Sequence, residues 1–147
     1  MTMIKDMLKP RVFLDANIFF SAFYGSANCE RIIKAHQQKE ISLVTSSLVI
    51  EESLRNIQEK IPSVASSFKD LLINNPPELL ADPSEIDPRI ELLVDKKDQP
   101  IFTSAILGKV KYFITGNTKD FKAKELEKAT GIKVLTPKQL VDLLKLK

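Results

Sequence analysis

The sequence predicts an α/β protein, a three-layer α/β/α sandwich with a central parallel sheet. Short apolar runs alternate along the chain with longer amphipathic stretches, and polar residues follow the apolar runs where each run ends. Strands that alternate with helices are typical of a parallel sheet covered on both faces and joined by right-handed crossovers. The 147 residues fit a single domain, 1–147, that is large enough to bury a core.

The first predicted strand, residues 11–14, ends abruptly on polar side chains. Residues 12–14 form a continuous apolar run, as expected of a central strand buried on both faces, and Asp15 follows it directly. Ligands of open α/β sheets bind at the carboxyl ends of the strands. A simpler role is also open, because Asp15 or Asn17 can cap a helix that begins near residue 18.

The remaining elements follow from periodicity and from end signals. Amphipathic spacing predicts helices, apolar runs predict strands, and proline, glycine and serine mark the ends of elements. In order, we expect a short helix to residue 23, a helix at 30–38, a strand at 41–45, helices at 48–60 and 64–72, a short strand at 78–80, a helix through 86–93, a helix at 101–107, a strand at 112–114, a helix ending at Gly131, a strand at 133–135 and a closing helix from Pro137.

Four carboxylates fall where this plan brings segments together. Asp15 follows the first strand, and Glu52 lies in the helix after the second. Asp98 opens a helix, and Asp120 lies just past the strand at 112–114. Parallel strands end at one shared edge, so we expect these acids to meet there. Each acid alone has an ordinary alternative role as a helix cap or as solvated surface, and their joint placement is what favours a site.

A cluster of carboxylates requires a neutralising partner. Two like charges roughly 4 Å apart repel by about 4 kcal/mol at an effective dielectric constant of about 20. Either protons neutralise them, with raised pKa values, or a divalent cation does, and Mg²⁺ or Mn²⁺ prefers oxygen ligands. A metal site of this kind can activate water against a phosphodiester bond.

In this order along the chain, the polar segments resemble the PIN domain (PilT amino-terminal domain) of metal-dependent ribonucleases, a family that includes the VapC-type toxins of toxin–antitoxin pairs. The segments are Leu14-Asp15-Ala16-Asn17, residues 46–52, Asp98-Gln99-Pro100-Ile101 with Ala105, and residues 115–121. The resemblance implies that Asp15, Glu52 and Asp98 are the core catalytic and metal-binding acids. It also implies that Asn17 and Thr115 are polar support around the metal or water.

The fourth position of this implied site has two candidates. Many relatives carry an aspartate two residues after the threonine of the last segment, where this chain has Asn117. An amide oxygen can bind a metal but adds no negative charge, so the fourth catalytic and metal-binding role falls to either Asn117 or Asp120. Glu52 is preferred to Glu51 because its spacing from Ser46 matches the family.

The resemblance implies an endoribonuclease that depends on Mg²⁺ or Mn²⁺ and hydrolyses phosphodiester bonds of an RNA substrate. It also implies a toxin held inactive by a small antitoxin protein, and a homodimer. We expect Lys97 and Lys119 to contact RNA phosphates, although a solvated basic surface is the alternative. No stacked aromatic series indicates a base preference, and only Tyr112 and Phe121 flank the expected site.

Bulk properties restrict the remaining possibilities. A net charge of +3 permits an anionic partner without requiring one, and the single cysteine, Cys29, cannot form an internal disulfide. No run approaches the ~20 apolar residues of a membrane span, so we expect a cytoplasmic protein without membrane contact. His36 stands alone, far along the chain from the acids.

Two other functions are compatible with the sequence. The first is a catalytically weak PIN-like module that binds RNA or protein, motivated by Asn117. The second is a phosphotransfer enzyme with Asp15 as its nucleophile. It is disfavoured because Asn17 stands where the haloacid dehalogenase type has a second acid.

Overall fold

The computed structural model describes residues 9–147 and places a parallel sheet at the centre of the molecule. In this part of the chain the sheet has five strands in the order β3-β2-β1-β4-β5, so the predicted α/β sandwich is confirmed. The strands are β1 (Arg11–Leu14), β2 (Ser42–Ser46), β3 (Glu78–Leu80), β4 (Tyr112–Ile114) and β5 (Lys133–Leu135). The helices are α2 (Ala16–Phe23), α3 (Ala27–Gln37), α4 (Ser47–Lys60), α5 (Ala65–Asn74), α6 (Gln99–Leu107), α7 (Ala123–Thr130) and α8 (Pro137–Leu144).

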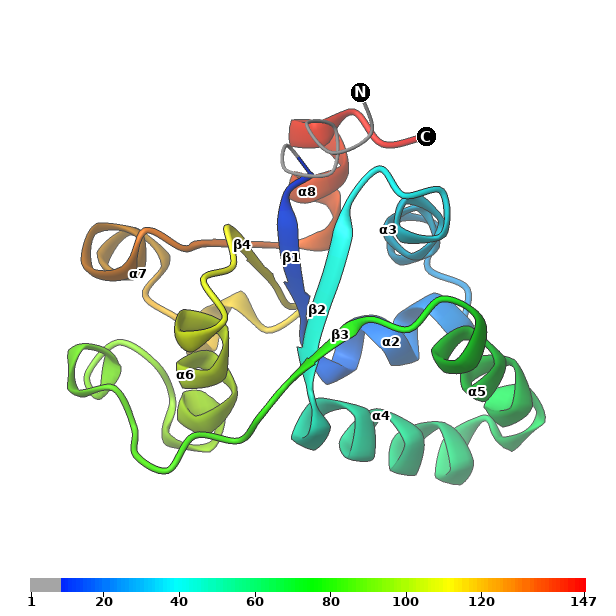
Figure 1. Cartoon of the computed structure of the whole chain (residues 1–147), viewed down its shortest axis with the longest axis horizontal. Helices are drawn as coiled ribbons and strands as arrows, with labels where there is room; N and C mark the ends of the chain where they lie inside the picture. Colours follow the sequence, from blue (N-terminus) through cyan, green and yellow to red (C-terminus); the bar gives the residue numbers. More distant parts are fainter. Residues whose placement is uncertain (1–8) are drawn as a thin grey trace.

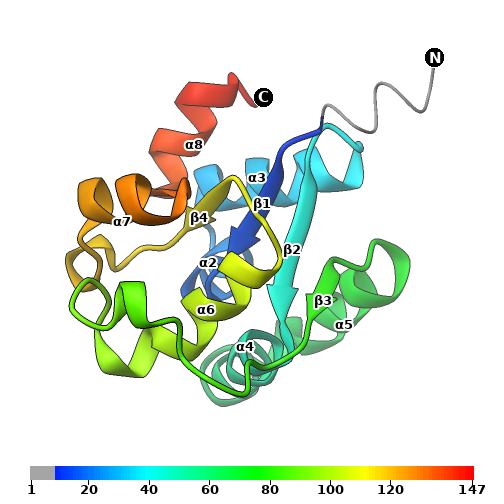
Figure 2. The same ribbon diagram turned by 60° about the vertical axis from the view of Figure 1, so that its left-hand side comes forward.

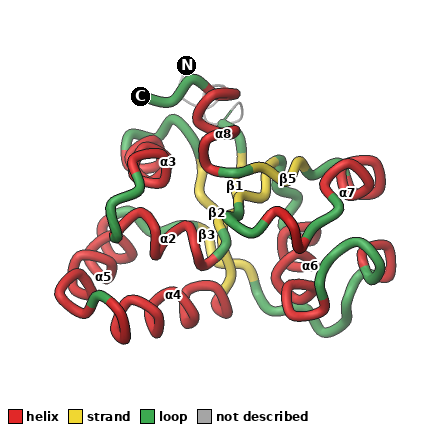
Figure 3. The backbone as a smooth tube through the Cα atoms, turned by 180° about the vertical axis from the view of Figure 1, so that it is seen from behind, coloured by secondary structure: helices red, strands yellow, loops and turns green. Residues whose placement is uncertain are grey.

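Helices cover the sheet from both sides. In Figure 1, α2, α3, α4 and α5 lie on one side of the strands, and α6 and α7 lie on the other. The view from behind in Figure 3 gives the same division, and Figure 2 shows α6 in front of the sheet with α2 and α3 behind it. The closing helix α8 packs against α3. These are the three layers that the alternation of elements predicts.

Strand β1 lies at the centre of the sheet, between β2 and β4. Its residues Val12, Phe13 and Leu14 are fully buried, and Leu14 is in register with Ile114 of β4. From β1 the chain first crosses to β2 on one side and later returns to β4 on the other side. Such a change of direction opens a crevice at the carboxyl ends of the two strands, where α/β proteins bind ligands.

Most predicted element ends are confirmed. Ser46 caps α4, because its hydroxyl accepts a hydrogen bond from the backbone N–H of Val49. Pro62 lies just beyond the end of that helix. Gly131 ends α7 with a φ of +79°, a left-handed conformation in which a Cβ atom would be strained. Thr136 and Gln139 form a capping box at the start of α8.

The prediction of a helix through residues 86–93 is wrong. Only a single 3₁₀ turn, Pro88–Ile90, forms there, and the side chain of Asp87 caps it. Ile90 is buried, whereas Leu92 is 87% exposed, so the apolar residues do not share one helical face. Residues 91–93 then form a turn, in which the N–H groups of Leu93 and Val94 donate to the carbonyl of Ile90, before Val94 pairs with Phe121 in an isolated antiparallel bridge. Long-range pairing therefore overrides the local helical spacing of this segment.

Within residues 9–147, no helix combines the length and the apolar character needed to cross a membrane.

Candidate metal centre

Asp15 lies at the amino terminus of α2, directly after the central strand. Its backbone N–H donates to the carbonyl of Ile114, which continues the ladder between β1 and β4. Its carboxylate oxygen Oδ1 accepts a hydrogen bond of 2.8 Å from the N–H of Ala16, and the side chain is only 7% exposed. The helix therefore begins at Ala16, two residues earlier than expected, and Asp15 rather than Asn17 is its cap.

Thr115 and Asn17 surround the second oxygen of Asp15. The hydroxyl of Thr115 donates to Oδ2 of Asp15 over 3.0 Å and accepts from the backbone N–H of Asn117 over 3.1 Å. Asn17 donates to Oδ2 of Asp15 and to the Thr115 hydroxyl, and its own oxygen accepts from the N–H of Gly116. This network joins the end of β1 to the end of β4 and holds the carboxylate in one orientation.

Asp98 lies across from Asp15 at the start of α6. Its side chain makes no capping hydrogen bond, although it occupies the cap position of that helix. Burial, followed by the nearby negative charge of Asp15, raises the pKa of Asp98 to about 6. Burial also raises the pKa of Asp15, while the hydrogen bonds from Ala16 and Thr115 act in the opposite direction. Asp15 thus lies close enough to Asp98 to disfavour the charged form of that carboxyl.

A cavity of about 330 Å³ opens over these two acids, and residues of α2, α4, α6 and the 3₁₀ turn Lys96–Asp98 line it together with Asp15 and Asn117. Helix α4 contributes Glu52, together with Asn56 and Lys60 one and two turns further on. The cavity is lined by Asp15, Ala16, Asn17, Phe20, Glu52, Asn56, Lys60, Lys97, Asp98, Ile101 and Asn117. The structure therefore brings three predicted acids and Asn117 to one cavity.

Asp120 belongs to a second, tighter group of acids beside this cavity. Among the described residues, one carboxylate oxygen from each of Asp95, Asp98 and Asp120 lies within 4.8 Å of the other two. Asp15 and Glu52 are not members of this group. Asp95 is a residue that the sequence analysis missed, because the expected helix over 86–93 gave no reason to place its carboxylate at the edge of the sheet.

Two chain segments are paired to bring Asp95 and Asp120 together. The N–H of Asp95 donates to the carbonyl of Asp120, and the N–H of Lys122 donates to the carbonyl of Leu93. Between them, Phe121 is buried against the rings of Phe102 and Phe113, at centroid distances of 6.0 and 5.2 Å. Phe121 therefore anchors the turn that carries Asp120.

The two predicted phosphate-binding lysines have different positions. The ammonium of Lys97 lies 3.5 Å from Oδ2 of Asp120, and the charges of Asp120 and then Asp98 raise the pKa of Lys97. Lys97 also lines the cavity over Asp15. Lys119 lines a separate hollow next to Asp120 instead. Of these two lysines, Lys97 is therefore the one in direct reach of a ligand at the acids.

The aromatic residues that border the cavity are not those expected. Tyr112 and Phe121 are each only 5% exposed and belong to the core. Phe20 lines the cavity instead, and its ring contacts that of Tyr24, which is 70% exposed. Phe20 lies in α2 and Tyr24 is the residue at its carboxyl-terminal cap, and their spacing of four residues was the available signal.

The donor set fits a hard divalent cation. The side chains that converge here offer carboxylate, amide and hydroxyl oxygens, which Mg²⁺ and Mn²⁺ prefer. No nitrogen or sulfur ligand competes in this part of the described chain: Cys29 is buried elsewhere, and His36 bonds the carbonyl of Asn75 and the N–H of Leu43. Burial and then the negative charge of Asp15 raise the pKa of Asp98, and a bound cation favours the charged form that both causes disfavour.

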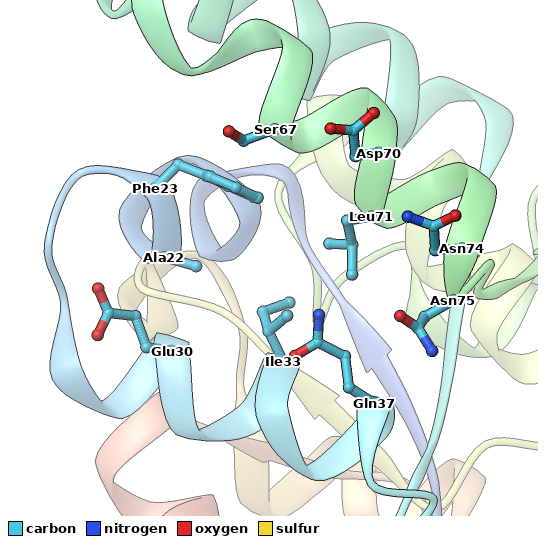
Figure 4. A pocket seen from close by; sticks show the side chains of 10 residues that line it. All are labelled: Ala22, Phe23, Glu30, Ile33, Gln37, Ser67, Asp70, Leu71, Asn74 and Asn75. Atoms are coloured by element: carbon cyan, nitrogen blue, oxygen red, sulfur yellow. The ribbon is translucent and has the colours of Figure 1, made fainter.

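A second cavity, of about 520 Å³, lies between α2, α3 and α5 (Figure 4). Its floor is apolar, and its rim carries the carboxylates of Glu30 and Asp70 with several amides. The lining side chains are Ala22, Phe23, Glu30, Ile33, Gln37, Ser67, Asp70, Leu71, Asn74 and Asn75. It contains no convergent group of acids, so the chemistry of the first cavity is absent here.

An acidic centre at the carboxyl edge of a parallel α/β sheet defines the class of this protein. Sequence comparison gives the same class, since a family model described as "PIN domain" matches residues 12–105. The chain belongs to the PIN domain family. The matched range contains Asp15, Glu52 and Asp98 and ends before Asn117 and Asp120. Among curated proteins, none matches the sequence.

Two solved structures are similar in fold. One is VapBC2 from Rickettsia felis bound to a DNA fragment from their promoter, with a TM-score of 0.60, 16% identity, and coverage of 86% of this chain and 98% of that chain. The other is a toxin–antitoxin complex from Klebsiella pneumoniae, with a TM-score of 0.59, 18% identity, and coverage of 86% and 97%. At these identities the likeness establishes a common fold.

Proposed function

We propose that this protein is an endoribonuclease that depends on Mg²⁺ or Mn²⁺. The observation that carries the proposal is the convergence of Asp15, Glu52 and Asp98 on one cavity, where burial and then the charge of Asp15 raise the pKa of Asp98 to about 6. Carboxylates that repel each other at the edge of a parallel sheet destabilise the fold, and a role in binding a cation accounts for their presence there.

In this proposal Asp15, Glu52 and Asp98 hold the metal, and either Asn117 or Asp120 completes the site. The bound ion supplies an activated water and stabilises charge on the phosphate. Thr115 and Asn17 keep the carboxylate of Asp15 aimed at the cavity through their hydrogen bonds to Oδ2. Lys97 neutralises the phosphate that enters.

Conservative substitution of the acids tests this function. We expect Asp15→Asn and Asp98→Asn each to keep the fold and to abolish cleavage of single-stranded RNA in Mn²⁺. Asp142→Asn is the matched control, because Asp142 is exposed and pairs with Lys138 in α8, away from the cavity lining. Activity that persists in either acid variant, or in excess chelator, would overturn the assignment.

We further propose that the nuclease is the toxin of a toxin–antitoxin pair, inhibited by a small protein partner, and that it acts as a homodimer. The shared fold with two toxin–antitoxin complexes supports this extension. Induced expression should arrest growth, and Asp98→Asn should relieve the arrest. Co-expression of a small neighbouring gene should also relieve it, and light scattering should give twice the monomer mass. Unimpaired growth with active enzyme would contradict the toxin role.

A catalytically weak RNA- or protein-binding module is the second candidate, favoured by one observation. Asn117 lines the cavity with the acids, where it adds no charge. Titration calorimetry with Mn²⁺ separates the two functions, since absence of binding at millimolar concentration would favour the module. If the metal binds, comparing Asp120→Asn with Asn117→Ala identifies the fourth position by the larger loss of affinity.

A further inference from the structure

An aromatic pair extends from the candidate metal centre along α2. Phe20 borders the cavity that contains Asp15, and the ring of Tyr24 lies 5.4 Å from the ring of Phe20 with a tilt of 31°. Tyr24 is 70% exposed, so most of its side chain is open to a ligand. Two adjacent rings of this kind offer π-faces on which planar groups can stack.

Helix α4 faces this pair with a row of polar side chains. Glu52, Asn56 and Lys60 follow one another at intervals of four residues, so they share one face of the helix, and all three line the cavity. The ammonium of Lys60 lies 5.6 Å from the centre of the Phe20 ring. A positive charge therefore accompanies the aromatic pair at the end of the cavity away from Glu52.

The spacing along α2 suits a polymer that passes through the cavity. With a rise of about 1.5 Å per residue, Phe20 lies ~7.5 Å and Tyr24 ~13.5 Å along the helix from Asp15. These steps are comparable to one and two nucleotides of an extended strand. Aromatic rings next to a cation are the arrangement that binds bases and phosphates of a single strand.

We propose that Phe20, Tyr24 and Lys60 form a stacking subsite for the nucleotides next to the scissile phosphate of single-stranded RNA. This inference rests on the proposed ribonuclease function and adds the path of its substrate. The rings of Phe20 and Tyr24 stack on two bases, and Lys60 neutralises the phosphate that links these two nucleotides. Because every base has a π-face, the subsite selects unpaired RNA over duplex more strongly than it selects a sequence.

Binding of a labelled RNA oligonucleotide to the metal-free protein tests the subsite without cleavage. By fluorescence anisotropy, Tyr24→Ala should weaken binding about 5-fold to 100-fold, as expected for one lost base stack, and Tyr24→Phe should retain the affinity. Ile73→Ala is the matched control, because Ile73 is 74% exposed on α5 and lines neither cavity. Lys60→Gln should reduce the slope of log affinity against log salt concentration by about 0.7, the value for one phosphate of a single strand. Lys69→Gln should leave this slope unchanged.

An abasic nucleotide moved along the oligonucleotide distinguishes stacking from a structural effect. The wild type should lose affinity when the abasic site reaches one particular position, and Tyr24→Ala should be insensitive to that same change. A wild-type affinity that does not depend on the position of the abasic site would overturn the subsite. So would a Tyr24→Ala substitution that lowers the affinity for intact RNA and for the abasic RNA by the same factor relative to the wild type. If those results accompany Mn²⁺-dependent cleavage, the proposed function stands without the subsite. A wild-type protein that neither binds nor cleaves RNA would overturn both.

Discussion

At Asp15 the two carboxylate oxygens have different partners. Oδ1 accepts from the N–H of Ala16 at the start of α2, and Oδ2 accepts from the hydroxyl of Thr115 at the end of β4. A carboxylate has about four lone-pair sites, so these two bonds and the longer one from Asn17 to Oδ2 still leave capacity for a further ligand. Capping and metal binding are therefore compatible roles for Asp15.

Thr115 is expected to act on metal affinity through Asp15. The Thr115→Val variant keeps the shape but removes the hydroxyl that donates to Oδ2 of Asp15, so the pKa of Asp15 should rise further and protons should compete better with Mn²⁺. We expect a loss of about 10-fold to 100-fold in Mn²⁺ affinity by titration calorimetry at neutral pH. Thr115→Ser should retain most of the affinity, and equal affinities for the two variants would contradict this role.

Asp98 should make the metal-free protein depend on pH in a predictable direction. Its pKa is about 6 in the folded protein, against an ordinary value of 3.8, so the folded state binds more protons between these values. The contribution of Asp98 to the free energy of unfolding is therefore fully present below pH ~4 and is lost as the pH rises through about 6. In EDTA, the melting temperature of Asp98→Asn should therefore increase relative to that of the wild type as the pH is raised from 4 to 8.

Thermal denaturation followed by circular dichroism measures this difference. Asp70→Asn is the control, since Asp70 lies on α5 at the second cavity. A difference between Asp98→Asn and the wild type that does not change with pH would show that Asp98 is not destabilised in the folded protein.

At the scale of elements, α4 is the helix that presents Glu52, Asn56 and Lys60 to the cavity, and its start is held by Ser46. The Ser46 side chain is fully buried, and its hydroxyl satisfies the N–H of Val49. Ser46→Ala should lower the free energy of unfolding by about 1 kcal/mol in urea titrations. The adjacent Ser47→Ala, at an exposed position, should change it by less than about 0.5 kcal/mol. Equal effects would mean that the cap does not secure α4.

At the scale of the whole molecule, metal binding should stabilise the fold, because the acids that hold the ion come from segments distant along the chain. A ligand at about 100 times its dissociation constant stabilises the folded state by about 2.7 kcal/mol. For a domain of this size, that corresponds to a rise of about 5 to 10 °C in melting temperature. We expect this rise with Mn²⁺ in the wild type and its absence in Asp15→Asn. An equal rise in both proteins would place the ion elsewhere.

Local patterns predicted much of the fold and part of the candidate site. The buried run of β1, the strand β4 and the helices with proline, serine or glycine signals at their ends appear close to their predicted positions. The prediction of a helix over 86–93 failed, because Val94 pairs with Phe121, which is distant along the chain, and the local spacing of apolar residues carries no information about such a contact. The same pairing explains why Asp95 was missed.

The sequence by itself determined that Asp15 follows a buried strand, that Glu52 lies in the helix after the second strand and that Asp98 opens a later helix. Periodicity and end signals are local, so they can be read without the fold. Only the tertiary structure decided that Asp95 approaches Asp98 and Asp120, that Phe121 is buried, and that Phe20 borders the cavity with Tyr24 beside it. Those relations depend on how distant segments pack around the sheet, where burial and close approach of charge are set.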